Sequence, residues 1–344
     1  MNGTTRRLAA LARWEVLLAM FLVVLILIGM SVSPVFLTGR NFANLISAVI
    51  EVAIMSLPMA LIIIAGEIDL SVEATVGLTA AILGSLFAAG VPIELAIVVV
   101  LIVGALGGLL NGVLVTRVGL PSLVVTLGTL ALYRGLALVI LESKGVSNFP
   151  DWFTTFGFGN LPGLPIPWPF VIYVALAIVL GVVLHRTWIG RQIFAIGKNK
   201  AAARFSGIRV TRIKLLLFVL SGTVAALAGT ILVARMSSAR ADVGSGLTLV
   251  VITIVLLGGV DIFGGRGTIP GVVLAFFTLA VLGNVLRLAN VSSDIQSIAV
   301  GLLLIVSVVI PTVARRVKEA VDRTQGGRRL PTGSVGGPGE VVTP

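Results

Sequence analysis

The sequence contains no cysteine and a single histidine, His185, so it lacks the residues for disulfides, thiol chemistry or a histidine-based metal site. It also lacks the phosphate-binding pattern G-x-x-x-x-G-K-[ST], which excludes ATP hydrolysis through that loop. No Ser-His-Asp set and no pair of catalytic carboxylates stands out. We therefore expect a protein that is not an enzyme and that uses no cofactor and no metal.

Charged residues are scarce as well. They make up 11% of the 344 residues, against roughly 25% in soluble domains. Hydrophobic residues account for 57%, and the mean hydropathy is +1.13, which predicts an all-α integral membrane protein. Glycine is abundant, with 40 residues. Gly104, Gly108 and Gly112 form a ridge of small residues that predicts close helix packing in lipid.

Long apolar runs divide the chain into spans of about 20 residues each. We predict ten transmembrane helices in one domain, 15–313, after a cytoplasmic segment, 1–14, and before a basic, largely disordered tail, 314–344. The predicted spans are 15–33, 43–65, 72–90, 93–116, 121–141, 168–186, 214–234, 247–263, 269–287 and 295–313.

Positive charge orients these spans. Of the 25 Lys and Arg residues, 19 fall on the side of the N-terminal segment, five fall on the other side, and Arg134 lies within a span. The positive-inside rule then makes both termini cytoplasmic. We expect a multi-pass membrane protein in contact with the lipid bilayer. The net charge of +11 sits in loops and tails beside the membrane, so we expect no nucleic-acid partner.

The cytoplasmic loop 187–214 carries seven basic residues and no acidic one. Within it, Asn199 can cap the start of a short alanine-rich helix, and Gly207 can end that helix in the left-handed conformation. A capped basic helix with no apolar core to join predicts docking on a cytoplasmic partner. An ordinary positive-inside loop is the alternative.

The external segment 142–168 contains six turn-forming Gly and Pro residues between Gly157 and Pro167, together with Trp152 and Trp168. It predicts an ordered cap on the outer face. Trp152 either contacts a partner protein there or anchors the cap at the lipid headgroups.

Polar side chains inside the spans are candidates for a substrate pathway. Glu51 and Arg134 lie in the second and fifth spans, where a charge costs about 2.5–3.5 kcal/mol and usually faces a partner or a cavity. They could pair, each could line a pathway, or Arg134 could reach the outer interface. Thr126, Thr129 and Tyr133 lie close to one face of the fifth span. There they suit a polyol or serve as packing residues.

Four motifs, taken in order, resemble the membrane-spanning permease subunit of carbohydrate ABC importers of the ribose, xylose and rhamnose kind. The resemblance runs from about residue 20 to residue 313, and Asp69 in the first motif joins the predicted pathway residues. The motifs are Gly66–Ser71 (G-E-I-D-L-S), Thr126–Gly135 (T-L-G-T-L-A-L-Y-R-G), Gly190–Gly207 (G-R-Q-I-F-A-I-G-K-N-K-A-A-A-R-F-S-G) and Leu257–Gly271 (L-G-G-V-D-I-F-G-G-R-G-T-I-P-G).

The resemblance implies a ten-helix permease fold of the vitamin-B12-importer type in a bacterial inner membrane, paired with a second permease subunit in a homodimer or heterodimer. It also implies a cytosolic ATP-binding cassette subunit that hydrolyses ATP and a periplasmic or secreted sugar-binding protein. The short helix of the basic loop would be the coupling helix that docks on the ATPase. The residues assigned to that role are Asn199, Lys200, Ala202, Arg204, Phe205 and Gly207.

The implied substrate is a monosaccharide, rhamnose-like or ribose-like. The run S-A-R-A-D-V-G at 238–244 looks most like permeases for rhamnose and for furanosyl signalling sugars. The chain departs from the family where Glu67 and Glu73 replace its usual glycines, which puts in doubt any role there that needs close backbone approach. The alternatives are an ion-coupled secondary transporter and an ABC permease for branched-chain amino acids or nucleosides.

Overall fold

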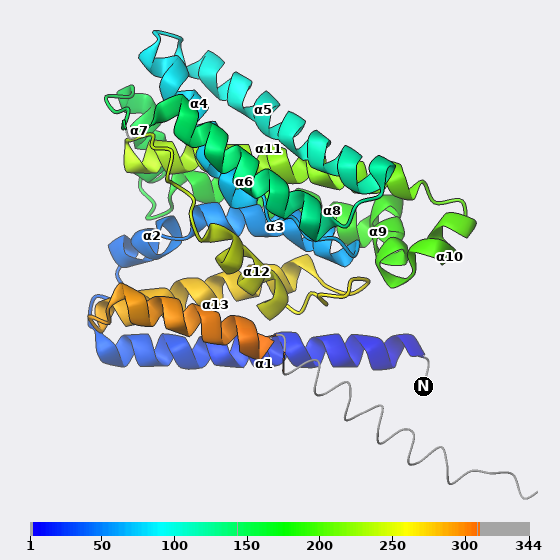
Figure 1. The fold of residues 1–344 in the computed structure, drawn as a ribbon. Helices are drawn as coiled ribbons and strands as arrows, with labels where there is room; N and C mark the ends of the chain where they lie inside the picture. Colours follow the sequence, from blue (N-terminus) through cyan, green and yellow to red (C-terminus); the bar gives the residue numbers. More distant parts are fainter. Residues whose placement is uncertain (1–2, 143, 308, 310–344) are drawn as a thin grey trace, which may run out of the picture.

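The structure, a computed structural model, describes residues 3–142, 144–307 and 309 (Figure 1). Two isolated β-bridges join Val146 to Ala239 and Asn160 to Pro167, and these described ranges contain no strand. The predicted all-α class is therefore confirmed. The helices are α1 (Gly3–Val32), α2 (Gly39–Ser47), α3 (Ile50–Ile64), α4 (Val72–Ala88), α5 (Ile93–Val113), the π-helix η1 (Leu114–Val118), α6 (Ser122–Leu141), α7 (Asp151–Phe158), α8 (Trp168–Arg186), α9 (Trp188–Lys198), α10 (Lys200–Phe205), α11 (Val210–Met236), α12 (Leu247–Leu257), α13 (Ile269–Leu288) and Ser293–Ser307.

Six helices in the described part of the chain are long and apolar enough to cross a membrane: α1, α5 with η1, α6, α8, α11 and α13. A seventh crossing results if α2 and α3, which are bent by 51° relative to each other, form one span. The remaining predicted spans correspond to the shorter helices α4, α12 and Ser293–Ser307. Helix length thus supports six or seven crossings, and the count of ten stays a prediction.

The predicted boundaries of the transmembrane domain can be compared with the structure mainly at the N-terminal end. α1 is continuous from Gly3, so most of the segment predicted to precede the first span is the beginning of the same helix. The end of the last predicted span and the tail 314–344 lie outside the described residues.

α3 and α11 form the centre of the molecule. All 15 residues of α3 are buried, and most of α11 is buried against α3, α4 and α5. A Cβ added at Gly104 would overlap the Gly222 carbonyl, and one at Gly108 would overlap the Phe218 carbonyl. The backbones of α5 and α11 are therefore in contact, as the glycine ridge predicted.

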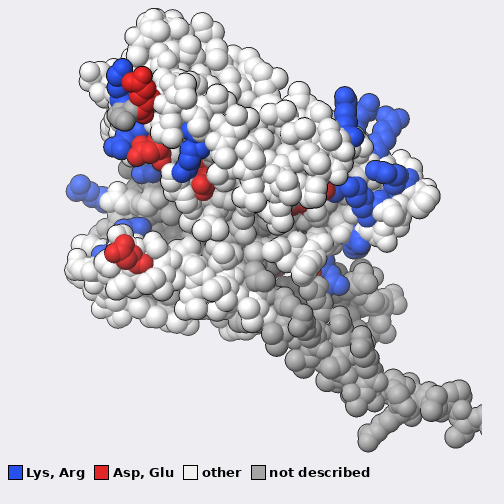
Figure 2. Space-filling view, in the orientation of Figure 1, with Lys and Arg blue, Asp and Glu red and all other residues white. Residues whose placement is uncertain are grey.

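The molecule has two different ends. The N-terminus, α9 and α10 lie at one end, and α2 and α7 lie at the other (Figure 1). Lys and Arg side chains gather at the end that carries α10 (Figure 2). The orientation predicted from charge makes this basic end cytoplasmic.

The segment 142–168 is ordered around α7 at the opposite end. Val146 pairs with Ala239 through two backbone hydrogen bonds of 2.8 and 3.0 Å. Gly157 lies so close to the backbone of Ala234 that a Cβ there would overlap it. Half of the surface of Trp152 is exposed. These contacts order the segment, and its place on the outer face and the role of Trp152 stay predictions.

α12 begins well inside the molecule. After α11 ends at Met236, residues 237–246 run back without helix from the end that carries α7, and α12 starts between the two ends (Figure 1). Gly246 has a φ of +82°, which only glycine adopts without strain. α12 ends at Leu257, short of the predicted end at residue 263, because the glycine-rich turn at 258–267 stops the helix.

Candidate functional site

α10 is a six-residue helix that projects from the basic end (Figure 1). The Asn199 side chain accepts a hydrogen bond of 3.0 Å from the Ala202 N–H, and Gly207 has a φ of +79°. Both predicted helix ends are therefore confirmed. Asn199, Lys200, Ala202, Arg204, Phe205 and Gly207 are all exposed.

Phe205 is the most informative of these side chains, because it is 94% exposed at the end of α10. Ala203 is the one buried residue of the helix. A large apolar side chain held in water by a capped helix is typical of a contact that a partner completes. Docking of α10 on that partner stays a prediction.

A glycine junction connects this helix to the membrane domain. α9, which leads into α10, approaches the end of α3 at Gly197, where a Cβ would overlap the Ile64 carbonyl. The same carbonyl accepts a hydrogen bond of 2.8 Å from the Gly265 N–H in the loop between α12 and α13. Gly264 lies against Gly66. Gly197 therefore packs directly against the end of α3 and against the loop between α12 and α13.

The Gly66–Ser71 linker holds a buried carboxylate beside this junction. Asp69 is almost fully buried, and its Oδ1 accepts hydrogen bonds from the N–H and Oγ of Ser71 at 3.0 and 2.6 Å. Its Oδ2 accepts from Ser221 Oγ on α11 at 2.8 Å. Asn111 on α5 donates to Ser71 Oγ at 2.8 Å. The linker is tied to two helices, and Asp69 faces protein; its contact with substrate stays a prediction.

Glu67 and Lys214 form a second charged contact in the linker. Lys214 Nζ lies against Glu67 Oε1, and the two side chains are 4% and 13% exposed. Lys214 stands at the basic end of α11, so the pair fixes the linker to that helix. A glutamate at this family glycine position therefore serves a tertiary contact.

Glu51 and Arg134 do not pair, which corrects one of the interpretations open from the sequence. Glu51, 3% exposed on α3, binds Arg235 at the end of α11, with Nε–Oε1 and Nη2–Oε2 distances of 2.7 and 3.4 Å. Both nitrogens of the guanidinium edge face the carboxylate, which is the favoured geometry for this pair. The sequence did not indicate Arg235 as the partner, because it lies 184 residues away.

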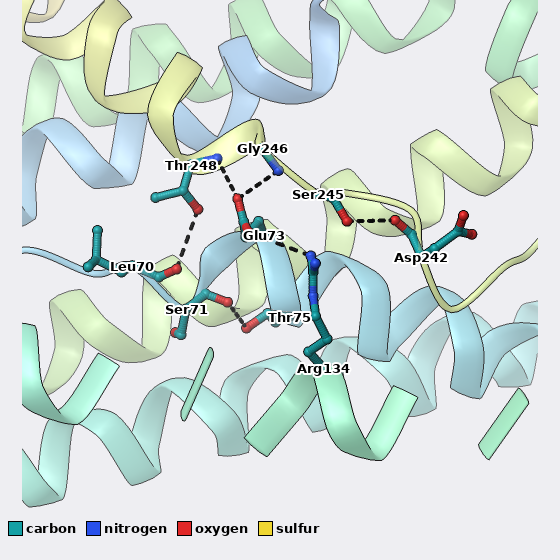
Figure 3. A network of polar contacts seen from close by, with 9 residues as sticks. All are labelled: Leu70, Ser71, Glu73, Thr75, Arg134, Asp242, Ser245, Gly246 and Thr248. Carbon is teal, nitrogen blue, oxygen red and sulfur yellow. Dashed lines mark hydrogen bonds and ion pairs between the residues drawn. The ribbon is translucent and has the colours of Figure 1, made fainter. Parts of the chain in front are cut away.

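Arg134 instead approaches Glu73 of α4 (Figure 3). Glu73 Oε2 accepts hydrogen bonds from the N–H groups of Gly246 and Thr248 at 3.0 and 3.1 Å, so it binds the positive end of α12. Glu73 Oε1 lies 3.5 Å from Arg134 Nη2. That distance exceeds the 2.7–2.9 Å of a strong charged hydrogen bond, and the guanidinium is held loosely.

This loose pair is also the more open one. The Arg134 side chain is 34% exposed and Glu73 is 13% exposed. Basic and acidic atoms interrupt the middle of a largely uncharged surface (Figure 2). Because a charge facing lipid is costly, we interpret this surface as facing water or a partner subunit.

The segment 237–246 brings further polar groups toward the same place. Arg240 donates to Asp242 through Nε and Nη2 at 2.9 and 2.8 Å. Those hydrogen bonds lower the pKa of Asp242, and the charge of Arg134 acts in the same direction. Ser245 Oγ donates to the Asp242 carbonyl at 2.9 Å (Figure 3). The surface therefore offers both donors and acceptors.

The hydroxyl groups predicted for the pathway donate hydrogen bonds to backbone carbonyls. Thr126 donates to the Ser122 carbonyl at 2.8 Å, and Thr129 donates to the Val125 carbonyl at 3.1 Å. Tyr133 donates to the Gly107 carbonyl at 2.9 Å. All three side chains are buried. Their packing role is visible, and a substrate contact stays a prediction.

No group of three or more His, Cys, Asp or Glu residues lies close enough to hold a metal ion among the described residues. The Nε2 atom of His185 accepts a hydrogen bond of 3.2 Å from the Ile269 N–H at the start of α13.

The buried central helices, the close glycine contacts and the projecting basic helix together define a polytopic transport subunit. The family described as "Branched-chain amino acid transport system / permease component" matches residues 41–308, and the chain belongs to that family of permeases. It is a multi-pass protein of the bacterial inner membrane, as predicted.

Curated relatives carry the name "Autoinducer 2 import system permease protein LsrD". The protein from Yersinia enterocolitica is 39% identical over 86% of this chain and 91% of its own length. The one from Escherichia coli K12 is 37% identical over 90% and 96%, and the one from Salmonella paratyphi B is 36% identical over 86% and 90%. No solved structure matches the chain.

Proposed function

We propose that this chain forms part of the translocation pathway of an ATP-driven importer for a small sugar, with ATP hydrolysed by a separate cytosolic cassette subunit. The observation that carries the proposal is α10, a capped and exposed helix at the basic end whose Phe205 is 94% exposed. Membership of an ABC permease family supports it. An ion-coupled transporter has no use for such a docking helix.

The proposed partners follow from this role. A cassette ATPase binds α10, and a second permease subunit, identical or different, completes the pathway. A periplasmic or secreted binding protein delivers the sugar to the cap formed by 142–168. The glycine junction at Gly197, Ile64 and Gly265 transmits movement of α10 to α3 and to the loop after α12.

We propose that Glu73 lines the translocation pathway together with Arg134. The pair is neutral overall, offers a carboxylate oxygen and several guanidinium donors, and is partly open. A neutral polyol can accept from Arg134 and donate to Glu73 without any net charge being desolvated. Asp69, Glu51, Thr126, Thr129 and Tyr133 support the surrounding helices in this proposal, through the hydrogen bonds and ion pair described above.

The relatives named for autoinducer 2 import favour a furanosyl signalling sugar as the first candidate, ahead of rhamnose and ribose. The family description raises branched-chain amino acids as a second candidate. Both can be compared in vesicles that contain the complete importer with its native ATPase, second permease and binding protein. ATP-driven uptake of labelled sugar that an excess of L-leucine leaves unchanged supports the sugar; inhibition by L-leucine contradicts it.

The coupling role is tested by Ala202→Pro in the same vesicles. Proline removes the N–H that Asn199 caps, and loss of a cap costs about 1 kcal/mol, enough to unfold so short a helix. We expect ATP-dependent uptake to fall at least about fivefold, the factor that corresponds to this cost, with normal insertion in the membrane. Ala202→Ser keeps the N–H and is the matched control. Unchanged uptake in the proline variant would contradict the proposed coupling.

A further inference from the structure

A cavity of about 470 Å³ lies at the base of α10, between the end of η1 and the start of α11. Its lining includes Arg117 from η1, Arg204 from α10, Arg209 at the N-cap of α11 and Arg212 in the first turn of α11. No acidic residue is among the lining residues. Four guanidinium groups therefore surround one opening, and none of them belongs to an ion pair among the described residues.

Guanidinium groups bind phosphate oxygens in a bidentate geometry that ammonium groups cannot match. Mutual repulsion of four like charges makes an anionic occupant favourable. The cavity also has an apolar part, formed by Ile208 and Leu215. An occupant that fits both parts combines a phosphate with an apolar body.

The surroundings identify the membrane side of the cavity. Val118 and Leu120, which lie one and three residues after Arg117, are 60% and 43% exposed, and Leu216, in the first third of α11, is 57% exposed. Exposed apolar residues beside a span end are the surface that acyl chains cover. The arginines are thus placed at the depth of the cytoplasmic headgroups, where basic residues attract anionic lipids.

We propose that this cavity is a binding site for an anionic phospholipid of the cytoplasmic leaflet. The phosphate lies among Arg117, Arg209 and Arg212, and the acyl chains run along Val118, Leu120 and Leu216. A bound lipid would join η1 to the start of α11 and support the base of α10. The site needs neither the ATPase nor the sugar, so it stands apart from the proposed function.

The test uses the purified full-length chain in detergent, stripped of lipid, and counts bound lipids by native mass spectrometry. Phosphatidylglycerol is titrated against phosphatidylcholine with the same acyl chains. We expect at least one phosphatidylglycerol to bind about tenfold more tightly than phosphatidylcholine. The double variant Arg117→Gln/Arg212→Gln should lose this preference without change in melting temperature. Arg204 is left intact because of its proposed role in docking.

The control is Arg191→Gln/Arg266→Gln, which removes two exposed cytoplasmic arginines outside the cavity. It should keep the full preference for phosphatidylglycerol. An equal loss in this control would show a general effect of surface charge and would overturn the site. Equal binding of the two lipids by the wild-type chain would also overturn the site. That result is expected if an acidic segment of a partner protein fills the cavity. Soluble glycerol phosphate should not displace the lipid, because it lacks the acyl chains.

Discussion

The ion pairs on α11 and the ion pair between α4 and α6 differ in how completely they are enclosed. On α11, Lys214 contacts Glu67, and the two side chains are 4% and 13% exposed. Arg235, also on α11, binds the buried Glu51 through two guanidinium nitrogens. On α6, Arg134 stands 3.5 Å from Glu73 and keeps a third of its surface exposed. The same residue types therefore serve two purposes in one membrane domain.

The difference follows from position. Water has little access to Lys214 and Glu51, so each of these charges depends on its partner for stabilisation, whereas the Arg235 side chain keeps 28% of its surface exposed. Arg134 lies on a surface that other helices do not cover, so it tolerates a looser partner. The buried pairs connect neighbouring elements of the fold, and the open pair is the one that we propose for contact with the ligand.

Lys214→Met should have the largest effect on stability. It leaves the Glu67 carboxylate buried without a partner, and breaking a buried pair costs about 3 kcal/mol or more. A clear fall in the melting temperature of the purified protein is the expected result. The double variant Glu67→Gln/Lys214→Met should recover at least half of that loss. If the single variant were as stable as the wild type, the pair would not hold the linker.

Glu51→Gln should have a smaller effect. The amide still accepts one hydrogen bond from Arg235, and Arg235 has partial access to solvent, so loss of the charged contact costs about 2 kcal/mol. The melting temperature should lie between those of the wild type and Lys214→Met. Glu51→Leu, which removes both acceptors, should be less stable than Glu51→Gln. The reverse order would show that the carboxylate is not what stabilises Arg235.

Arg134→Gln should leave stability almost unchanged, because an exposed and poorly aligned pair contributes less than about 1 kcal/mol. Its expected effect is on transport: the KM for sugar uptake should rise about tenfold, as expected when a charged hydrogen bond to the ligand is lost. Arg134→Lys should restore part of this loss. A melting temperature as low as that of Lys214→Met, with unchanged KM, would make the pair structural and remove it from the pathway.

Asp242→Asn should have the smallest effect. The pair with Arg240 is exposed on both sides, and such pairs contribute little in water. Because Arg240 lowers the pKa of Asp242, any contribution is present at neutral pH and disappears as the pH falls through the acidic range. We expect no measurable change in melting temperature at pH 7, in low or high salt. A large change would mean that residues 237–246 are held mainly by this pair.

The features that the sequence predicted correctly are local ones. Asn199 and Gly207 mark the ends of α10 because a cap and a left-handed glycine act within a few residues. The glycine ridge of α5 predicted close packing because a missing side chain permits backbone contact with any neighbour. Apolar composition alone indicated a helical membrane protein and placed most of the spans.

The features that only the tertiary structure decided depend on residues far apart in the chain. Which cation meets which carboxylate was not visible in the sequence: Glu51 could have met Arg134, yet its partner is Arg235, 184 residues away. Glu73 was visible as a charge at the start of a helix, but its hydrogen bonds to Gly246 and Thr248 follow from where the chain returns before α12. Local hydrogen bonding and hydropathy are set by neighbouring residues, so the sequence determined the helices, the N-cap of α10 and the location of the protein in a membrane. Charge pairing inside a bundle is set by how the helices pack, and the packing alone separated the buried pairs from the open one.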